Sequence, residues 1–188
     1  MKTGRNMVVL SLLLFTFCIN IAAHDDANAA QRGRKGGGVA TLTAAEKATM
    51  IHMREEEKLA RDVYIKMFEL WGATIFSNIS VSEQRHMDAV LNLLVKYGIP
   101  DPVAGKGVGE FTDAFKGLYD ELVFQGQQSL LDAYMVGRAI EEMDIDDLEA
   151  AMTETSKADI DNVYGNLLNG SYNHLDAFNA HIPSLTQY

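Results

Sequence analysis

Apolar residues recur every three or four positions along most of this chain, which is the spacing that places them on one face of an α-helix. No stretch alternates apolar and polar residues between hairpin turns, so the pattern predicts no β-strand. The apolar stripes predict helices over about 44–70, 81–97, 111–124, 130–148 and 157–182. We therefore expect an all-α fold, a four-helix bundle with an extra short helix in the long crossover between its halves.

Residues typical of helix ends mark the expected boundaries. The helix starts are expected at a Ser or Thr with an acidic residue three positions later: Thr43 with Glu46, Ser80 with Glu83, Ser129 with Asp132, and Ser156 with Asp159. Gly72 and Gly98 end the first two helices, and Pro100 prevents the second from continuing.

Each of the four long helices also carries acidic or histidine side chains within its apolar stripe, at about 100° per residue. On the first helix, Glu56 and Glu57 lie at the two borders of the stripe, whereas Glu55 points away from it. The inward set consists of Glu57, Glu83, His86, Glu141, Asp144 and His174. An unpaired buried carboxylate costs several kcal/mol, and a pair of divalent cations in the middle of the bundle would satisfy all of these groups together.

Ordinary structural roles are the alternative for the same side chains. Glu56 and Glu57 could lie at the rim of the bundle and form ion pairs with Arg54, Lys58 or Arg61. Glu83 could cap its helix with His86 exposed, and Asp144 could be the N-cap of a restarted helix. His174 could be a hydrogen-bonded core residue. Patterns on single helices do not decide between the two sets of roles.

The first 29 residues have the pattern of a secretory signal peptide. Lys2 and Arg5 precede an apolar run at 8–19, and Ala27-Asn28-Ala29 offers a cleavage site. A membrane anchor is the alternative, but the run is shorter than the ~20 residues that a spanning helix needs. We expect a signal peptide at 1–29, a basic glycine-rich linker at 30–42 and one domain at 43–183, and hence a secreted or periplasmic protein without stable membrane insertion after cleavage.

The chain is acidic, with a formal net charge of −10 over 188 residues. Removing residues 1–29 deletes two basic and two acidic side chains, so the net charge stays −10. This charge argues against nucleic acid or an anionic membrane as a partner and favours attraction of cations. Cys18 is the only cysteine and lies in the expected signal peptide, so any metal site must use oxygen and nitrogen ligands.

Several motifs together resemble a known group of helical proteins. The run E-K-L-A-R-D-V-Y at 57–64 is similar to the first-helix pattern of bacterioferritins and rubrerythrins, and E-Q-R-H at 83–86 resembles their second-helix E-x-x-H. With I-E-E-M-D-I-D-D-L and N-G-S-Y-N-H-L-D-A-F, these runs resemble the DUF2202 branch of the ferritin-like superfamily over about 44–182. The resemblance implies that Glu57 is a metal ligand, that Tyr64 packs beside the site, and that Glu83 bridges two metals.

One position departs from that superfamily. Its members carry a second E-x-x-H on the fourth helix, but here Ser171 stands three residues before His174. Asp144, one turn beyond Glu141, could replace the missing carboxylate; otherwise the site would be asymmetric or hold a single metal.

The preferred interpretation is an exported di-metal carboxylate protein that binds iron and reacts with O2 or peroxide. Manganese and zinc also suit a mixed nitrogen and oxygen ligand set. The alternative is a non-catalytic secreted helical module with a hydrogen-bonded polar interior and a surface that binds a partner. Neither the residues nor the resemblance indicates an oligomeric state.

Overall fold

The computed structural model describes residues 41–182, except for the side chains of residues 113 and 114. The expected signal peptide and residues 30–40 of the expected linker lie outside this range. The described part contains helices and no strand, which confirms the all-α prediction. Its helices are α1 (Ala44–Trp71), α2 (Thr74–Tyr97), α3 (Asp113–Gly126), α4 (Leu130–Glu154) and α5 (Ala158–Asn179). None of these helices is long and apolar enough to cross a membrane.

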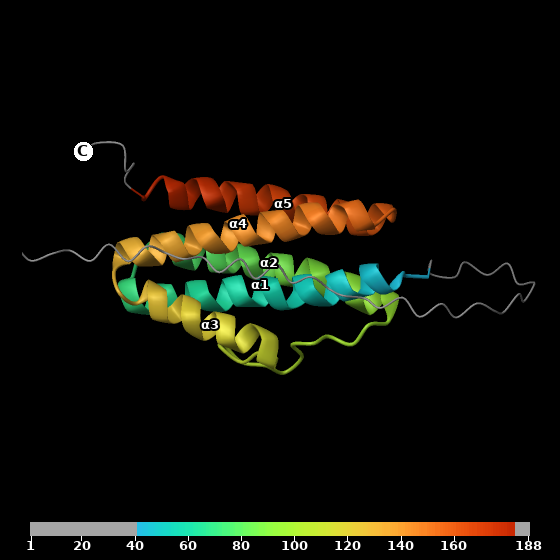
Figure 1. Ribbon diagram of the computed structural model, residues 1–188, viewed down its shortest axis with the longest axis horizontal. Helices are drawn as coiled ribbons and strands as arrows, with labels where there is room; N and C mark the ends of the chain where they lie inside the picture. Colours follow the sequence, from blue (N-terminus) through green and yellow to red (C-terminus); the bar gives the residue numbers. More distant parts are fainter. Residues whose placement is uncertain (1–40, 183–188) are drawn as a thin grey trace, which may run out of the picture. The chain divides into compact units, whose positions relative to one another are not determined.

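The four long helices pair in chain order. Helix α1 packs mainly against α2, and α4 mainly against α5, while α1–α4 and α2–α5 contacts join the two pairs (Figure 1). Only residues 72–73 connect α1 to α2, and only 155–157 connect α4 to α5, so each pair is antiparallel. The long crossover carries α3, which packs against α1 and α4. This is the bundle with an extra crossover helix that the apolar pattern predicts.

Local chemistry explains most of the helix ends. Thr43 and Glu46 form the predicted capping box, and the Ser129 hydroxyl accepts a hydrogen bond from the Asp132 amide. Gly72 and Gly98 have φ values of 66° and 67°, a left-handed conformation that glycine adopts without a steric penalty.

The predicted start of the second helix is wrong. Helix α2 begins at Thr74, and the Ser80 hydroxyl donates to the carbonyl of Ser77 within the helix, so Ser80 and Glu83 do not form a capping box. The buried side chains of Phe76 and Ile79 explain the earlier start, because they extend the apolar face that packs on the bundle.

One alternative role and one further expectation about helix ends are wrong. Helix α4 runs unbroken through Asp144, so the alternative of an N-cap at this residue does not hold. Helix α5 begins after Lys157, without a side-chain cap from Ser156, and ends at Asn179 rather than near 182.

The crossover segment covers the outer face of α1. Glu55, which was expected to point away from the bundle, is buried there and accepts a hydrogen bond from Thr112. Buried Lys58 pairs with Asp62 and donates to the carbonyl of Gly107. A helical wheel gives the direction of a side chain but not the segment that later packs over it.

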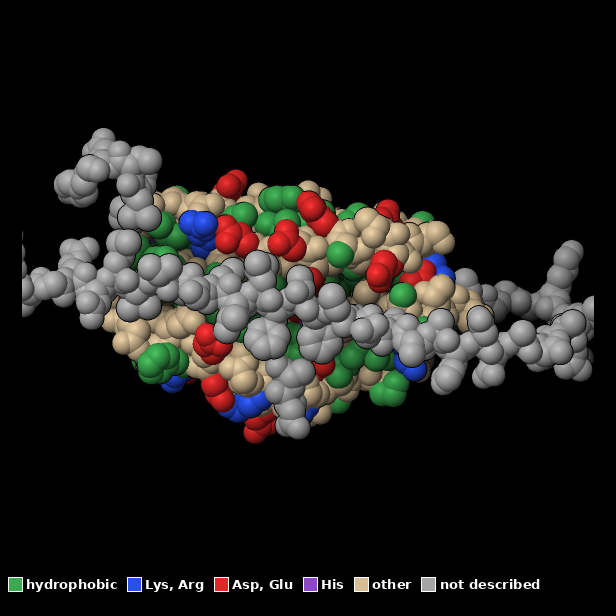
Figure 2. Space-filling view, in the orientation of Figure 1, with side chains coloured by type: hydrophobic (Ala, Val, Ile, Leu, Met, Phe, Trp, Pro, Cys, Tyr) green, Lys and Arg blue, Asp and Glu red, His purple; other side chains and the backbone are tan. Residues whose placement is uncertain are grey.

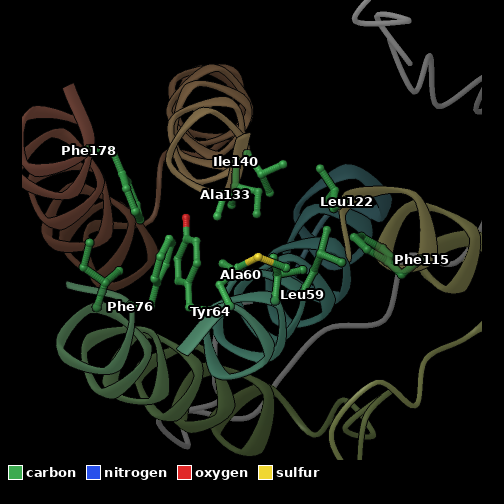
Figure 3. Close-up of a cluster of buried hydrophobic side chains, with 13 residues drawn as sticks. Leu59, Ala60, Tyr64, Phe76, Phe115, Leu122, Ala133, Ile140 and Phe178 are labelled. Carbon is green, nitrogen blue, oxygen red and sulfur yellow. The ribbon is translucent and has the colours of Figure 1, made fainter. Parts of the chain in front are cut away.

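Two hydrophobic clusters form the core. One surrounds Tyr64, Phe76 and Phe178, whose rings pack together between the helices (Figure 3). The other contains Met53, Leu94, Leu148 and Tyr164 among its members. On the face that Figure 2 leaves uncovered, acidic side chains are spread among other types rather than gathered in one patch. Inside the bundle, several acidic side chains of the described residues are buried.

Candidate metal centre

A polar layer separates the two hydrophobic clusters. On every long helix, the residues of one cluster stop before the inward polar side chains and those of the other cluster begin after them. On α1, for example, the clusters include Met53 on one side and Leu59 on the other, with Glu56 and Glu57 between. The layer is buried, because Glu57, Glu83 and Glu141 are each exposed by 2% or less.

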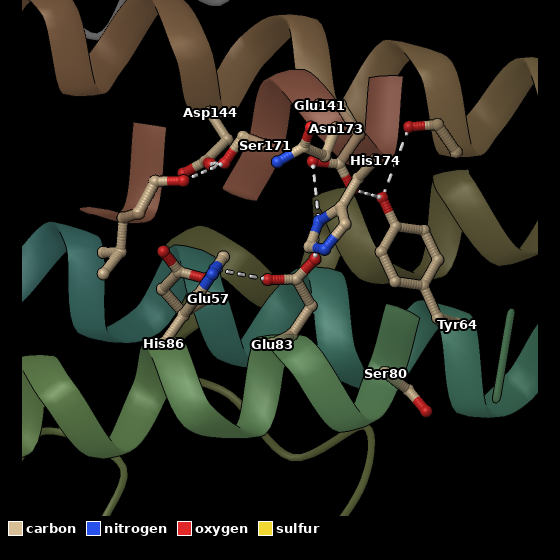
Figure 4. Close-up of polar contacts among 12 residues, drawn as sticks. Glu57, Tyr64, Ser80, Glu83, His86, Glu141, Asp144, Ser171, Asn173 and His174 are labelled. Atoms are coloured by element: carbon tan, nitrogen blue, oxygen red, sulfur yellow. Dashed lines mark hydrogen bonds and ion pairs between the residues drawn. The ribbon is translucent and has the colours of Figure 1, made fainter. Parts of the chain in front are cut away.

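Glu83 lies at the centre of this layer. One of its oxygens is 2.8 Å from Nδ1 of His86, and the other is 2.8 Å from Nδ1 of His174 (Figure 4). Glu57 Oε2 is 3.2 Å from the same nitrogen of His86, and Glu141 Oε2 is 3.4 Å from the same nitrogen of His174. Two groups of possible ligands therefore share Glu83, one with Glu57 and His86 and the other with Glu141 and His174.

The donor atoms in each group lie within 4.8 Å of one another. Two ligands bound ~2.1 Å from one ion, at angles of about 90–110°, lie ~3.0–3.4 Å apart. The distances from the histidine Nδ1 atoms to the carboxylate oxygens around Glu83, 2.8–3.4 Å, are close to that range. The predicted residues Glu57, Glu83, His86, Glu141 and His174 thus converge from all four long helices.

Asp144 lies beside these two groups but belongs to neither. One of its oxygens accepts a hydrogen bond from the hydroxyl of Ser171, the residue three positions before His174. Its other oxygen, Oδ1, is buried without a hydrogen bond from the described residues. Ser171 therefore orients Asp144 on the neighbouring helix, and the acidic group at this end of the layer comes from α4 rather than α5.

Tyr64 donates a hydrogen bond to Glu141. Its hydroxyl lies 2.6 Å from Oε1 of Glu141, while Oε2 of the same carboxyl group faces His174. Burial, followed by the negative charges of Glu141 and Glu83, raises the pKa of Tyr64 well above its usual value. The tyrosine therefore stays protonated and acts as a hydrogen-bond donor.

The orientation of His86 depends on a close approach between α2 and α5. A Cβ atom added at Gly170 would lie 2.6 Å from both Cε1 and Nε2 of the imidazole. Helix α5 continues without a break through Asn169 and Gly170. Gly170 provides room for the histidine.

The pKa values of several side chains in this layer are shifted far from their usual values. Burial alone would raise the pKa of Glu83, but its contacts with His174 and His86 outweigh burial and hold that pKa well below its usual value. Burial would lower the pKa of His86, yet Glu57 and Glu83 raise it well above its usual value. Burial and the charge of Asp144 raise the pKa of Glu57. Without a cation, this layer must hold protons on imidazole and carboxyl groups to limit its negative charge.

Several buried polar atoms in the layer lack a hydrogen-bond partner among the described residues. They are Oε1 of Glu57, Oε1 of Glu83, Oδ1 of Asp144 and Nδ1 of His174. Of these atoms, Oε1 of Glu83 and Nδ1 of His174 face each other at 2.8 Å as an ion pair when the histidine is protonated. An unsatisfied buried polar atom costs about 1–3 kcal/mol, so a set of them on facing helices fits a bound cation better than a hydrogen-bonded interior. The rim ion pairs considered for Glu56 and Glu57 are absent, because Arg54 pairs with Asp101 and Arg61 with Asp62.

Sequence reasoning left three neighbouring residues out of the candidate ligand set. His52, Glu56 and Asp147 form a further group whose donor atoms lie within 4.8 Å of one another. The i, i+4 spacing of His52 and Glu56 on a helix was the available signal, but no motif connected it to Asp147.

The fold and this layer define a class of protein, an all-α bundle whose long helices enclose a buried carboxylate and histidine cluster. Within that class the chain belongs to the DUF2202 family, an uncharacterized protein domain whose family model matches residues 46–187.

Two comparisons agree with this membership. The uncharacterized protein MJ0754 of Methanocaldococcus jannaschii is 51% identical over 138 residues, which are 73% of this chain and 75% of the relative. The crystal structure of hypothetical protein MJ0754 from Methanococcus jannaschii DSM 2661 matches with a TM-score of 0.75 at 46% identity, covering 80% of this chain and 90% of that chain. Neither description states an activity.

Proposed function

We propose that this protein is an exported di-metal carboxylate protein that binds iron and reacts with O2 or peroxide. The observation that carries the proposal is the shared position of Glu83 between two groups of ligands, each with one histidine and one further glutamate. One ion would be held by Glu57, Glu83 and His86, and the other by Glu83, Glu141 and His174. Asp144 would add negative charge beside them.

Bound Fe(II) ions would supply the electrons for reduction of O2 or peroxide. The residues of the chain would position the ions and exclude bulk water from them. Glu83 would contribute negative charge to both ions and the two imidazoles would bind as neutral donors, while the Tyr64 hydroxyl holds one oxygen of Glu141 in place. The donor set selects its metal weakly, so manganese and zinc are the competitors to test.

The alternative is a secreted helical module without metal. That function needs a polar interior in which hydrogen bonds satisfy the buried groups. The oxygens of Glu57 and Asp144 that accept no hydrogen bond from the described residues argue against it.

The first test of the proposal is metal content. Full-length protein purified without chelators should contain stoichiometric metal, and Glu83→Ala should lower the occupancy. Glu142→Ala is the matched control, because Glu142 lies on α4 at the surface and pairs with Arg138. Circular dichroism checks that both variants keep their helices. Metal-free wild-type protein whose stability does not change on adding Fe(II), Mn(II) or Zn(II) would favour the module.

Reactivity is tested separately. Protein loaded with Fe(II) without oxygen should consume O2 or hydrogen peroxide faster than Fe(II) in buffer, and Glu83→Ala and His86→Ala should abolish the excess. Equal rates with wild-type protein, variants and buffer would reduce the proposal to metal binding.

Export is tested by mass spectrometry of protein recovered from the native host. A mature chain that starts near Ala30 is expected, and a soluble cytoplasmic product that retains residues 1–29 would contradict export.

A further inference from the structure

A second cluster of possible ligands lies between α1 and α4, outside the two groups that share Glu83. It consists of His52 and Glu56, one turn apart on α1, and Asp147 on α4. Nε2 of His52 is 3.0 Å from Oδ2 of Asp147 and 3.5 Å from Oε2 of Glu56. These two separations are close to the ~3.0–3.4 Å expected between two ligands ~2.1 Å from one ion.

Glu56 is the member of the cluster that needs an explanation. Its side chain is 1% exposed, and neither carboxyl oxygen accepts a hydrogen bond from the described residues. Asp144, Asp147 and its chain neighbour Glu57 lie close enough for their negative charges to act on it. A carboxylate buried among other acidic groups, with only the His52 imidazole 3.5 Å away, is unfavourable unless a proton or a cation balances its charge.

The other two members are accessible from solvent. The side chain of His52 is 24% exposed and that of Asp147 is 43% exposed. The ring of Phe115, from the crossover helix α3, packs 5.3 Å from the ring of His52 and restricts its orientation. The cluster thus has a buried carboxylate, an oriented imidazole and an exposed carboxylate, an arrangement that an ion can reach without opening the bundle.

We propose that His52, Glu56 and Asp147 form a second, solvent-accessible binding site for one divalent transition-metal ion. Nε2 of His52 and one oxygen of each carboxylate supply three ligands, and water completes the coordination at the exposed side. One nitrogen and two oxygen ligands suit Mn(II), Fe(II), Co(II) or Zn(II). This site does not depend on metal binding at Glu83.

Co(II) is a suitable probe, because its visible absorption reports on nitrogen and oxygen ligands and equilibrium dialysis gives its stoichiometry. In full-length protein, Asp147→Asn should remove one equivalent of bound Co(II) or weaken it about tenfold or more, the loss that even an outer-shell partner can cause. Asp146→Asn is the matched control, since it makes the same charge change at the adjacent, exposed position. It should leave binding unchanged.

Variants that also carry Glu83→Ala distinguish Co(II) binding at this site from Co(II) binding at the two groups that share Glu83. In the Glu83→Ala variant, whose occupancy at the two buried groups is lowered, adding His52→Gln should remove one further equivalent of Co(II) together with its absorption band. Retention of that equivalent in the Glu83→Ala, His52→Gln double variant would overturn this site. Loss of all Co(II) from Glu83→Ala alone, with its helices intact, would overturn it as well. If Glu83→Ala binds as many equivalents of Co(II) as the wild-type protein while His52→Gln binds fewer, the result contradicts the proposed function and supports the site at His52, Glu56 and Asp147.

Discussion

Gly170→Ala tests how closely the geometry of the buried centre depends on backbone approach. The added methyl group would lie 2.6 Å from two atoms of the His86 ring, whereas non-bonded carbon atoms sit at about 3.5–4.0 Å. The imidazole must therefore move by about 1 Å. This shift breaks the placement of Nδ1 at 2.8 Å from Glu83 and 3.2 Å from Glu57.

Two opposing free energies determine the stability of the variant. Replacing glycine by alanine inside a helix stabilises it by up to about 1 kcal/mol. Overpacking against a side chain costs about 1–3 kcal/mol. We expect the metal-free Gly170→Ala protein to have a free energy of unfolding between unchanged and about 2 kcal/mol lower, and to bind Co(II) at the Glu57, Glu83 and His86 group at least about tenfold more weakly.

Gly165→Ala is the matched control on the same helix. Its added methyl group meets only the Met152 Cε atom, at an ordinary 3.8 Å, so this variant should be more stable by up to about 1 kcal/mol and bind Co(II) normally. Urea unfolding of the metal-free proteins and Co(II) titration measure both quantities. Equal stabilisation and equal Co(II) affinity in the two variants would refute the idea that Gly170 positions His86.

Three further variants test individual contacts. Ser171→Ala removes the donor to Asp144, so it should lower the free energy of unfolding by about 1 kcal/mol in urea titrations and weaken Co(II) binding in dialysis. Tyr64→Phe leaves Oε1 of Glu141 without its donor and should cost about 1–2 kcal/mol by the same measurement. Glu46→Gln tests pH dependence, because Lys157 and the Thr43 cap outweigh the effect of burial and lower the pKa of Glu46 to about 2. The pKa of Glu46 is lower in the folded protein than in the unfolded chain, so its carboxylate stabilises the fold at high pH. The wild-type protein should have a free energy of unfolding about 1 kcal/mol above that of Glu46→Gln at pH values above 4.5, and this difference should disappear as the pH falls to about 2. Urea unfolding at several pH values measures it.

The spacing of apolar residues could predict the helices and the inward polar residues, because each helix of a four-helix bundle buries one face against the other helices. His174 lies inside the bundle because its stripe continues the spacing of Leu167 and Phe178, and no distant segment changes that. Periodicity could not predict the start of α2. There the contacts of Phe76 and Ile79 outweigh the capping pattern of Ser80, and those contacts depend on the partner helices.

The residues missed by sequence reasoning share another cause. Glu55 is buried because the crossover segment carrying Thr112 returns over α1, and His52 is oriented because Phe115 of α3 packs on it. Both effects come from a segment about sixty residues away, whose path no helical wheel describes. A contact between helices also matters at Ser171, where comparison with the E-x-x-H motif finds a missing carboxylate. The hydrogen bond from Ser171 to Asp144 shows that the neighbouring helix supplies an acidic group at that end of the layer, so an absent motif residue does not by itself indicate an incomplete site.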